Sequence, residues 1–269
     1  MKSRANFLMI AASLGFAFLY LPIISLVIFS FNESKLVTVW GGFSTKWYTS
    51  LLENEALKDA LVNSLIVASV SASLATVLGT IAALSLTRLG NFRGKTLLSG
   101  MVTSPMVMPD VIIGLSLLLL FVAMEGLIGW PAGRSLTTII IAHTTFCMAY
   151  VTVVVQSRLS NMDESLQEAA LDLGAKPFSL FFLITLPLII PALVSGWLLA
   201  FTLSFDDLVI ASFVAGPGNS TLPMIIFSKV RLGVSPDINA LATIMISIVA
   251  LGVLVAIWNI SRSSKRKKV

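Results

Sequence analysis

Six long apolar stretches run through the chain, and no other feature constrains its fold as strongly. They cover residues 7–31, 61–87, 97–124, 136–156, 188–209 and 239–260. A helix needs about 20 consecutive apolar residues to cross a bilayer, and in lipid only helices and closed barrels satisfy every backbone polar group. Only 12% of the residues are charged, against about 25% in soluble domains. The sequence therefore predicts an all-α, polytopic membrane bundle with six transmembrane helices.

The distribution of Lys and Arg indicates how the bundle is oriented. The first stretch, 7–31, is longer than a signal-peptide core and no small-residue cleavage site follows it, so it is expected to be a retained span. With the N-terminus in the cytoplasm, twelve Lys and Arg residues fall in cytoplasmic segments and six on the other side. Both termini are therefore expected in the cytoplasm. The basic residues of the tail are Arg262, Lys265, Arg266, Lys267 and Lys268.

Several function classes are disfavoured by what the chain lacks. The net charge of +5 comes from Lys and Arg at the ends of the apolar stretches, which argues against nucleic acid binding. His143 and Cys147 are the only residues of their kinds, so neither a metal site nor an internal disulfide is expected. No Ser/His/Asp or Cys/His grouping indicates catalysis. Residues 90–96 have three residues between their glycines where a phosphate-binding loop needs four, so nucleotide chemistry is expected on another chain.

The second and third stretches are not plain lipid-facing spans. Residues 61–87 are crowded with Gly, Ala, Ser and Thr, which predicts a helix packed closely inside the bundle. Residues 97–124 contain Pro105, Pro109 and Asp110 in their first half. Each proline removes a backbone hydrogen bond, so a break is expected there, against protein or a water-filled cavity. Asp110 either caps the broken helix at the interface or lines a polar path.

A second acidic group ends the fifth stretch. Ser204, Asp206 and Asp207 lie there with no Lys or Arg at neighbouring positions to pair with the acids. A charge at membrane depth costs about 2.5–3.5 kcal/mol on insertion scales, so the alternatives are a solvated helix end or a cation-attracting path with Asp110. Adjacent helical residues point about 100° apart, so the two acids are not expected to face such a path equally. Trp47, in the polar loop 32–60, belongs either to an interfacial aromatic belt or to a substrate entrance.

The loop 158–185, between the fourth and fifth stretches, reads as a short amphipathic helix. Asn161 with Glu164 predicts a capping box, and Gly174 followed by Pro177 predicts the stop. One face would carry the apolar residues Leu166, Ala169, Ala170 and Leu173, and another the acids Glu164, Glu168 and Asp172. The apolar face is expected to be covered either by the chain's own bundle or by a groove on a partner.

The same loop resembles a known family signature. Glu168, Ala169, Ala170, Gly174, Ile184, Leu186 and Pro187 match the EAA loop of ABC importer permeases in identity, spacing and position along the chain. This resemblance covers roughly 60–258 and implies a type I ABC importer permease fold. It also implies that the loop forms a coupling helix in a cleft of a cytoplasmic ATPase. On that basis Glu168, Ala169, Ala170 and Gly174 are expected to couple to the ATPase, which would bind ATP and Mg²⁺, so no cofactor is expected in this chain.

Further runs narrow the resemblance to polyamine importers. The segments 108–114 (MPDVIIG), 204–210 (SFDDLVI) and 213–218 (FVAGPG) resemble the permeases of bacterial spermidine and putrescine importers, most of all the second permease of putrescine systems. The resemblance implies an inner-membrane complex of two different permeases, an ATPase dimer and a periplasmic polyamine-binding protein. The expected substrate pathway contains Asp110, Ser204, Asp206, Asp207 and Trp47. The expected domains are 1–59 (first helix and periplasmic loop), 60–258 (permease domain) and 259–269 (basic tail).

Two other functions remain open at this point. A permease of the same family for spermidine, or for another small solute, would share the EAA loop, and the unpaired acids disfavour an anionic cargo. An ion-coupled secondary transporter would use the same acids as proton or cation sites. Such a transporter needs no cytoplasmic coupling helix, so the EAA loop favours the ABC permease.

Overall fold

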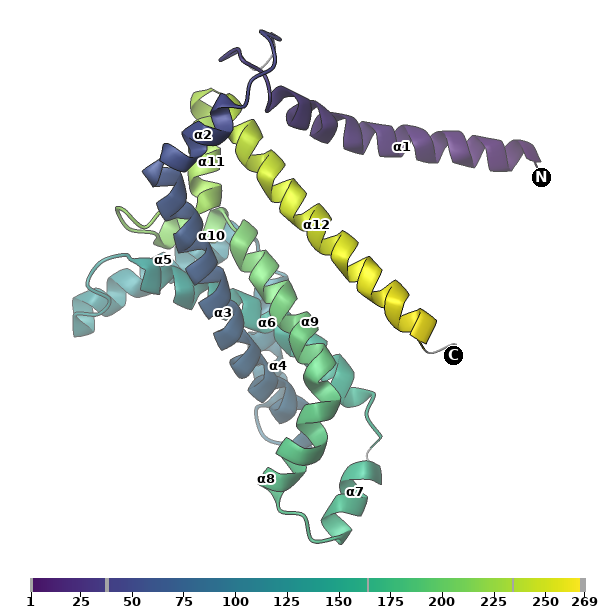
Figure 1. Ribbon diagram of the computed structural model, residues 1–269. Helices are drawn as coiled ribbons and strands as arrows, with labels where there is room; N and C mark the ends of the chain where they lie inside the picture. The colour runs from purple at the N-terminus through teal and green to yellow at the C-terminus, as the bar shows by residue number, and fades with distance from the viewer. Residues whose placement is uncertain (1, 37–38, 164, 234, 267–269) are drawn as a thin grey trace. The chain divides into compact units, whose positions relative to one another are not determined.

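The computed structural model describes residues 2–36, 39–163, 165–233 and 235–266, and these form helices only, apart from an isolated antiparallel bridge between Asn32 and Phe43. The helices, shown in Figure 1, are α1 (Lys2–Phe29), α2 (Lys46–Glu53), α3 (Glu55–Arg88), α4 (Lys95–Thr103), the 3-10 turn η1 (Ser104–Met106), α5 (Asp110–Ile128), α6 (Leu136–Ser160), α7 (Ser165–Asp172), α8 (Pro177–Leu180), the π-helical turn η2 (Phe181–Thr185), α9 (Leu186–Asp206), α10 (Val209–Val214), α11 (Leu222–Leu232) and α12 (Pro236–Arg266).

Five helices in the described ranges are long and apolar enough to cross a membrane. They are Asn6–Phe29, Glu55–Arg88, Asp110–Ile128, Leu136–Ser160 and the run Pro177–Asp206. α12 carries a shorter apolar stretch, Pro236–Gly252. The predicted all-α, polytopic architecture is confirmed. α12 continues the sixth predicted stretch through most of the basic tail, and Lys267 and Lys268 lie outside the described residues.

The third predicted stretch is interrupted where its prolines lie. α4 ends at Thr103, the turn η1 covers Ser104–Met106, and α5 begins at Asp110. Pro105 lies inside this turn and Pro109 occupies the N-cap position of α5, where a missing N–H costs no helical hydrogen bond. The predicted break is confirmed, and the membrane-length helix is α5 alone instead of the whole of 97–124.

The chain divides into two compact units. The first contains Met1–Lys58 and Ile226–Val269, and the second contains Asp59–Ile225. Within the second unit α6 is the most buried helix and packs along α9. Val151 of α6 lies between two glycines: a Cβ added to Gly79 of α3 would lie 2.9 Å from Val151 Cβ, and one added to Gly196 of α9 would lie 3.4 Å from Val151 Cγ1. Close backbone approach therefore holds three membrane-length helices together.

The small-residue face of α3 is buried, as predicted. Ala68, Ala72, Ala75 and Ala83 are fully buried, and Ser71 Oγ donates a hydrogen bond to the carbonyl of Ile140 in α6 (3.1 Å). At its start α3 also holds the segment that follows α10. Asn63 Nδ2 donates to Ser220 O (3.2 Å), and Ser64 Oγ accepts from the backbone N–H of Leu222 (2.7 Å).

Replacing Gly79 by alanine is expected to destabilise the second unit. The added Cβ would lie 2.9 Å from Val151 Cβ and 3.1 Å from the carbonyl oxygen of Met148, so α3 and α6 must separate. Overpacking of this kind costs about 1–3 kcal/mol, which a lower melting temperature of the purified transporter would report. Gly100→Ala is the matched control, because nothing lies within 4 Å of its added Cβ. Equal melting temperatures for the two variants would contradict this packing.

The first unit is organised around the buried side chain of Asn32, just after α1. Its Nδ2 donates to the carbonyls of Leu36 (3.2 Å) and Val39 (2.8 Å), and its Oδ1 accepts from the N–H of Gly41 (2.8 Å). The indole Nε1 of Trp47, in α2, donates to the carbonyl of Asn32 (2.6 Å). Asn32 therefore folds the polar loop after α1 onto itself, and Trp47 helps to fix it.

Candidate functional site

Three acids of the second unit line one cavity. Asp110 begins α5, Asp206 ends α9 and Asp207 follows it, and together they line a cavity of about 290 Å³. The remaining lining residues are Phe146, Thr202, Leu203, Leu208 and Val209. We call this cavity the acidic cavity. The structure thus brings Asp110 together with Asp206 and Asp207, which lie nearly a hundred residues further along the chain.

The three carboxylates differ in what they already bind. Asp207 has a side chain only 8% exposed, and it accepts hydrogen bonds from the backbone N–H groups of Ile210 (3.3 Å) and Ala211 (2.8 Å). Asp110 and Asp206 are exposed, and their carboxylates have no hydrogen-bond or ion-pair partner within the described ranges. Two of the three acids are therefore available to a cation, while the third is satisfied inside the protein.

A buried histidine joins Asp207 to Ser204. His143 of α6 is fully buried; its Nδ1 lies 2.7 Å from Ser204 Oγ and its Nε2 lies 3.1 Å from Asp207 Oδ2. The second contact has the distance but not the direction of a hydrogen bond. The sequence did not reveal this contact, because His143 lies in α6 and Ser204 in α9, far apart in the chain. The one signal available was an ionisable residue inside an apolar span.

This grouping is not built for nucleophilic catalysis. Ser204 is 4% exposed and His143 is fully buried, so a substrate has no access to the hydroxyl. The single cysteine, Cys147, is also buried one turn further along α6. Among the residues the structure describes, no three His, Cys, Asp or Glu side chains are placed to hold a metal ion. The polar set links α6 to the end of α9 beside the acidic cavity.

Two predicted pathway residues, Ser204 and Trp47, do not line the acidic cavity. Ser204 is buried beside His143, whereas Trp47 has a different setting. It belongs to the first unit, where its Nε1 is bonded to Asn32 and the ammonium of Lys46 lies 4.9 Å from its ring centroid. Its polar atom is therefore already used in holding the loop after α1.

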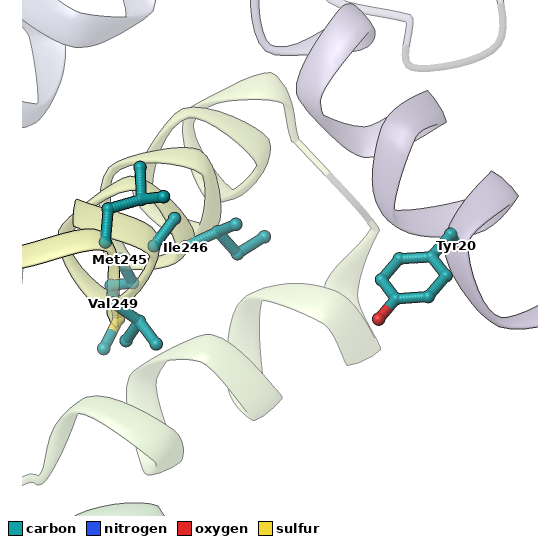
Figure 2. Close-up of a pocket in the computed structure, with 6 residues that line it drawn as sticks. Tyr20, Met245, Ile246 and Val249 are labelled. Atoms are coloured by element: carbon teal, nitrogen blue, oxygen red, sulfur yellow. The ribbon is translucent and has the colours of Figure 1, made fainter. Parts of the chain in front are cut away.

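A larger cavity in the first unit has a different character. It measures about 680 Å³ and lies between α1 and α12, lined by Tyr20, Met245, Ile246, Val249, Ala250 and Leu254 (Figure 2). None of these side chains carries a charge. A cation would find no counter-charge on this lining, so the acidic cavity is the better candidate for a charged ligand.

The loop between α6 and α9 carries the second candidate site. In Figure 1, α7 and α8 extend beyond the ends of α6 and α9, at the end of the unit away from α10. α7 presents Leu166, Ala169 and Leu173 outward, and Leu173 is 90% exposed. Of the predicted apolar face only Ala170 is buried in the chain itself. The described part of the chain therefore leaves most of this face uncovered.

Gly174 ends α7 with a Schellman motif. Its φ is +80°, its N–H bonds to Leu171 O (2.8 Å), and the N–H of Ala175 bonds to Ala170 O (3.0 Å). These are the two hydrogen bonds that define the motif. Nothing lies within 4 Å of a Cβ added at this position, so the positive φ and not crowding requires the glycine. The predicted glycine stop is confirmed.

The predicted start of this helix was wrong. Asn161 is the C-cap of α6, which runs to Ser160, and its Nδ2 donates to the carbonyl of Ser157. Glu164, the other half of the predicted capping box, lies outside the described residues. Asp163 instead accepts from the N–H of Ser165 (3.0 Å), and hydrogen bonds from the backbone and hydroxyl of Ser165 lower the pKa of Asp163.

Two arginines join the ends of the helices that carry this loop. Arg158 Nε donates to the carbonyl of Leu188 in α9 (3.1 Å), which ties the end of α6 to the start of α9. Arg88 Nη2, at the end of α3, donates to the carbonyl of Leu159 (3.1 Å). The end of α6 is thereby tied to both α3 and α9. Of these helices, α6 and α9 also carry residues that line the acidic cavity.

The chain is similar to known transport proteins over most of its length. The putrescine transport system permease protein PotI of Escherichia coli (strain K12) is 56% identical over 264 residues, which cover 98% of this chain and 94% of that protein. The spermidine/putrescine transport system permease protein PotC of the same organism is 43% identical over 251 residues, covering 93% and 92%.

A solved structure and a family model agree with these relatives. A crystal structure of a bacterial ABC transporter involved in the import of the acidic polysaccharide alginate matches with a TM-score of 0.75 at 17% identity, covering 97% of this chain and 96% of that one. At this identity the match shows the fold, which is that of an ABC importer permease. The family model described as the binding-protein-dependent transport system inner membrane component matches residues 75–269. The chain belongs to the family of inner membrane components of binding-protein-dependent transport systems.

Proposed function

We propose that the chain is a permease subunit of an ATP-driven importer that carries polyamines, putrescine foremost, into the cytoplasm across the bacterial inner membrane. The acidic cavity carries this proposal. Asp110 and Asp206 are exposed, open to a cation, and set in a cavity of about 290 Å³. A polyamine has amines several carbons apart, so two separate carboxylates suit it better than one.

The other walls of the cavity fit the same cargo. Thr202 brings a hydroxyl, while Phe146 and Leu203 supply apolar surface for the carbon chain between the amines. An ammonium over an aromatic ring gains about 0.5–2 kcal/mol, so Phe146 adds to the attraction of the acids. Ser204 and Asp207 belong to the same pathway region, behind the exposed surface. Trp47, whose Nε1 is bonded to Asn32 and whose ring lies beside the ammonium of Lys46, is proposed to border the entrance of the pathway.

The loop between α6 and α9 is proposed to couple the permease to an ATPase. Glu168, Ala169 and Ala170 lie in α7, and Gly174 forms its stop. An outward apolar face beyond the helix ends fits a cleft on a partner, as amphipathic helices bind grooves. The arginine hydrogen bonds described above would pass the movement of that partner to α6 and α9.

The proposed topology has six spans, with α12 as the sixth and both termini in the cytoplasm. The excess of Lys and Arg in the cytoplasmic segments supports it. The domains are 1–59, 60–258 and 259–269, as expected from the sequence. The proposed complex contains a second, different permease, an ATPase dimer that binds ATP and Mg²⁺, and a periplasmic polyamine-binding protein. The permease names of the relatives support this assignment.

Uptake measurements test the proposed function. Cells lacking this chain are supplied with labelled putrescine or spermidine, with and without its re-expression. Re-expression is expected to restore ATP-dependent putrescine uptake, and an ATPase is expected to co-purify with the chain. Uptake of spermidine without uptake of putrescine would identify spermidine as the cargo. Uptake driven by an ion gradient without ATP would instead identify a secondary transporter and overturn the proposal.

A further inference from the structure

We propose that His143 is a positioning residue for the cargo path, which it serves by holding Asp207 against the start of α10. The set His143, Ser204 and Asp207 is called the α10 brace below. The role in cargo binding rests on the proposed function, whereas the brace itself is a property of the fold. The two neighbouring acids then have different roles. Asp206 contacts the cargo, whereas Asp207 fixes the position of α10.

The proton on His143 is assigned from its neighbours. A serine hydroxyl both donates and accepts, whereas an ionised carboxylate only accepts. With the proton on Nε2, that N–H lies beside Asp207 Oδ2, 3.1 Å away but off the direction of a hydrogen bond, and Ser204 donates to Nδ1 at 2.7 Å. The other tautomer would place a lone pair against the carboxylate. The first tautomer therefore satisfies Nδ1 through Ser204 and places the positive end of the Nε2–H bond beside the carboxylate of Asp207.

Asp207 transmits this contact to α10. The first N–H groups of a helix have no partner inside it, and an acidic side chain before the helix commonly accepts them. Asp207 does so for Ile210 and Ala211. At the other end of α10, Thr138 Oγ1 donates to the carbonyl of Val214 (2.8 Å). Both His143 and Thr138 belong to α6, so one buried helix holds α10 at its two ends.

α10 in turn lies against the helix that starts with Asp110. A Cβ added at Gly114 of α5 would lie 2.7 Å from Phe213 Cδ2 and 3.3 Å from Ile210 Cα, so the two helices touch with no room to spare. A shift of α10 must therefore move α5 or separate it from α10. Because Asp110 begins α5 and Asp206 immediately precedes Asp207, loss of the α10 brace is expected to change the separation of the two acids and weaken cargo binding.

Two substitutions separate the two ring nitrogens of His143. The amide of glutamine reaches the position of Nε2 and can still bond Asp207, whereas the shorter asparagine reaches only the position of Nδ1 and Ser204. In the complete transporter reconstituted in vesicles, His143→Asn is expected to raise the KM for putrescine about tenfold, because it leaves the buried carboxylate of Asp207 without its polar neighbour. His143→Gln is expected to recover most of that loss, and Vmax should change far less than KM.

A double-mutant cycle tests whether His143 acts through Asp207. His143→Asn combined with Asp207→Ala is expected to raise KM no further than Asp207→Ala alone. Combined with Asp206→Asn, it is expected to raise KM by less than the product of the two single effects, because the α10 brace acts through the positions of Asp110 and Asp206. Thr145→Val is the control on the same helix, since that hydroxyl donates only to Ile141 O in its own turn.

Three results would overturn the proposal. They are equal KM values for the glutamine and asparagine variants, multiplied effects of His143→Asn and Asp207→Ala, or a lower melting temperature with an unchanged KM. Failure of the proposed function has a different signature, namely no putrescine uptake by the wild-type transporter. In that event the melting temperatures of the same variants still test the α10 brace. If the double variant His143→Asn with Asp207→Ala loses as much melting temperature as the two single variants together, the brace is refuted.

Discussion

Replacing Gly174 by valine is expected to abolish transport and to weaken association with the ATPase, while the chain still inserts in the membrane. Gly174 has a φ of +80° and closes the Schellman motif at the end of α7. An L-residue in this conformation costs about 1–2 kcal/mol, and a branched side chain is worse placed than most. α7 would therefore lose its defined end, and with it the position of the outward face that includes Ala169.

Two further variants separate the two ways in which Gly174→Val can impair ATPase association, namely loss of the left-handed turn and added bulk at the docking surface. Asparagine tolerates the left-handed conformation, so Gly174→Asn retains the turn and adds bulk only at the docking surface. Gly233→Val meets the same backbone problem, with a φ of +130° and open space around the added Cβ, but between α11 and α12. We expect this variant to co-purify with the ATPase normally. Normal co-purification and uptake by Gly174→Val would remove α7 from the coupling mechanism.

Replacing Asp206 by asparagine is expected to depress polyamine uptake strongly with ATPase association intact. Asp206 is exposed in the acidic cavity and, within the described chain, its carboxylate has no partner to hold it in another role. Removing one partner of a hydrogen-bonded charge pair costs about 2–5 kcal/mol, so KM should rise by about thirtyfold or more. Asp110→Asn is expected to act in the same direction.

The control for these acids is an isosteric change outside the acidic cavity. Glu125, near the end of α5, accepts a hydrogen bond from the backbone N–H of Gly133 (2.9 Å), which a glutamine oxygen can also accept. Glu125→Gln is therefore expected to leave uptake unchanged. If Asp206→Asn and Asp110→Asn also leave KM unchanged, the two acids are solvated helix ends without a role in cargo binding.

Local chemistry predicted the long helices well because each apolar stretch carries its own signal. The break at Pro105 and Pro109 and the stop at Gly174 were predicted for the same reason, since each depends on one residue's backbone. Asn161 shows the limit of this reasoning. Its sequence context fits a helix start, but α6 extends to Ser160 and places it at a helix end, because tertiary packing prolongs the buried helix.

The arrangement of the acidic cavity was only partly accessible from the sequence. The charges of Asp110 and Asp206 in apolar surroundings marked them as candidates, whereas the different state of Asp207 depends on α10. That helix has six residues, too few for a periodic signal. The contact between His143 and Ser204 joins residues 61 apart in the chain. Only the packing of α6 against α9 brings them together, so a single sequence offers no spacing from which to infer it.

Photo-crosslinking from two equally exposed leucines tests the account most directly. Leu173, at the end of α7, is 90% exposed, and Leu232, at the end of α11, is 87% exposed. With a photoreactive residue at either position in the assembled transporter, we predict that position 173 captures the ATPase subunit and position 232 does not. Capture of the ATPase from position 232 would contradict the proposed topology. Failure to capture it from position 173 would contradict the coupling role of α7.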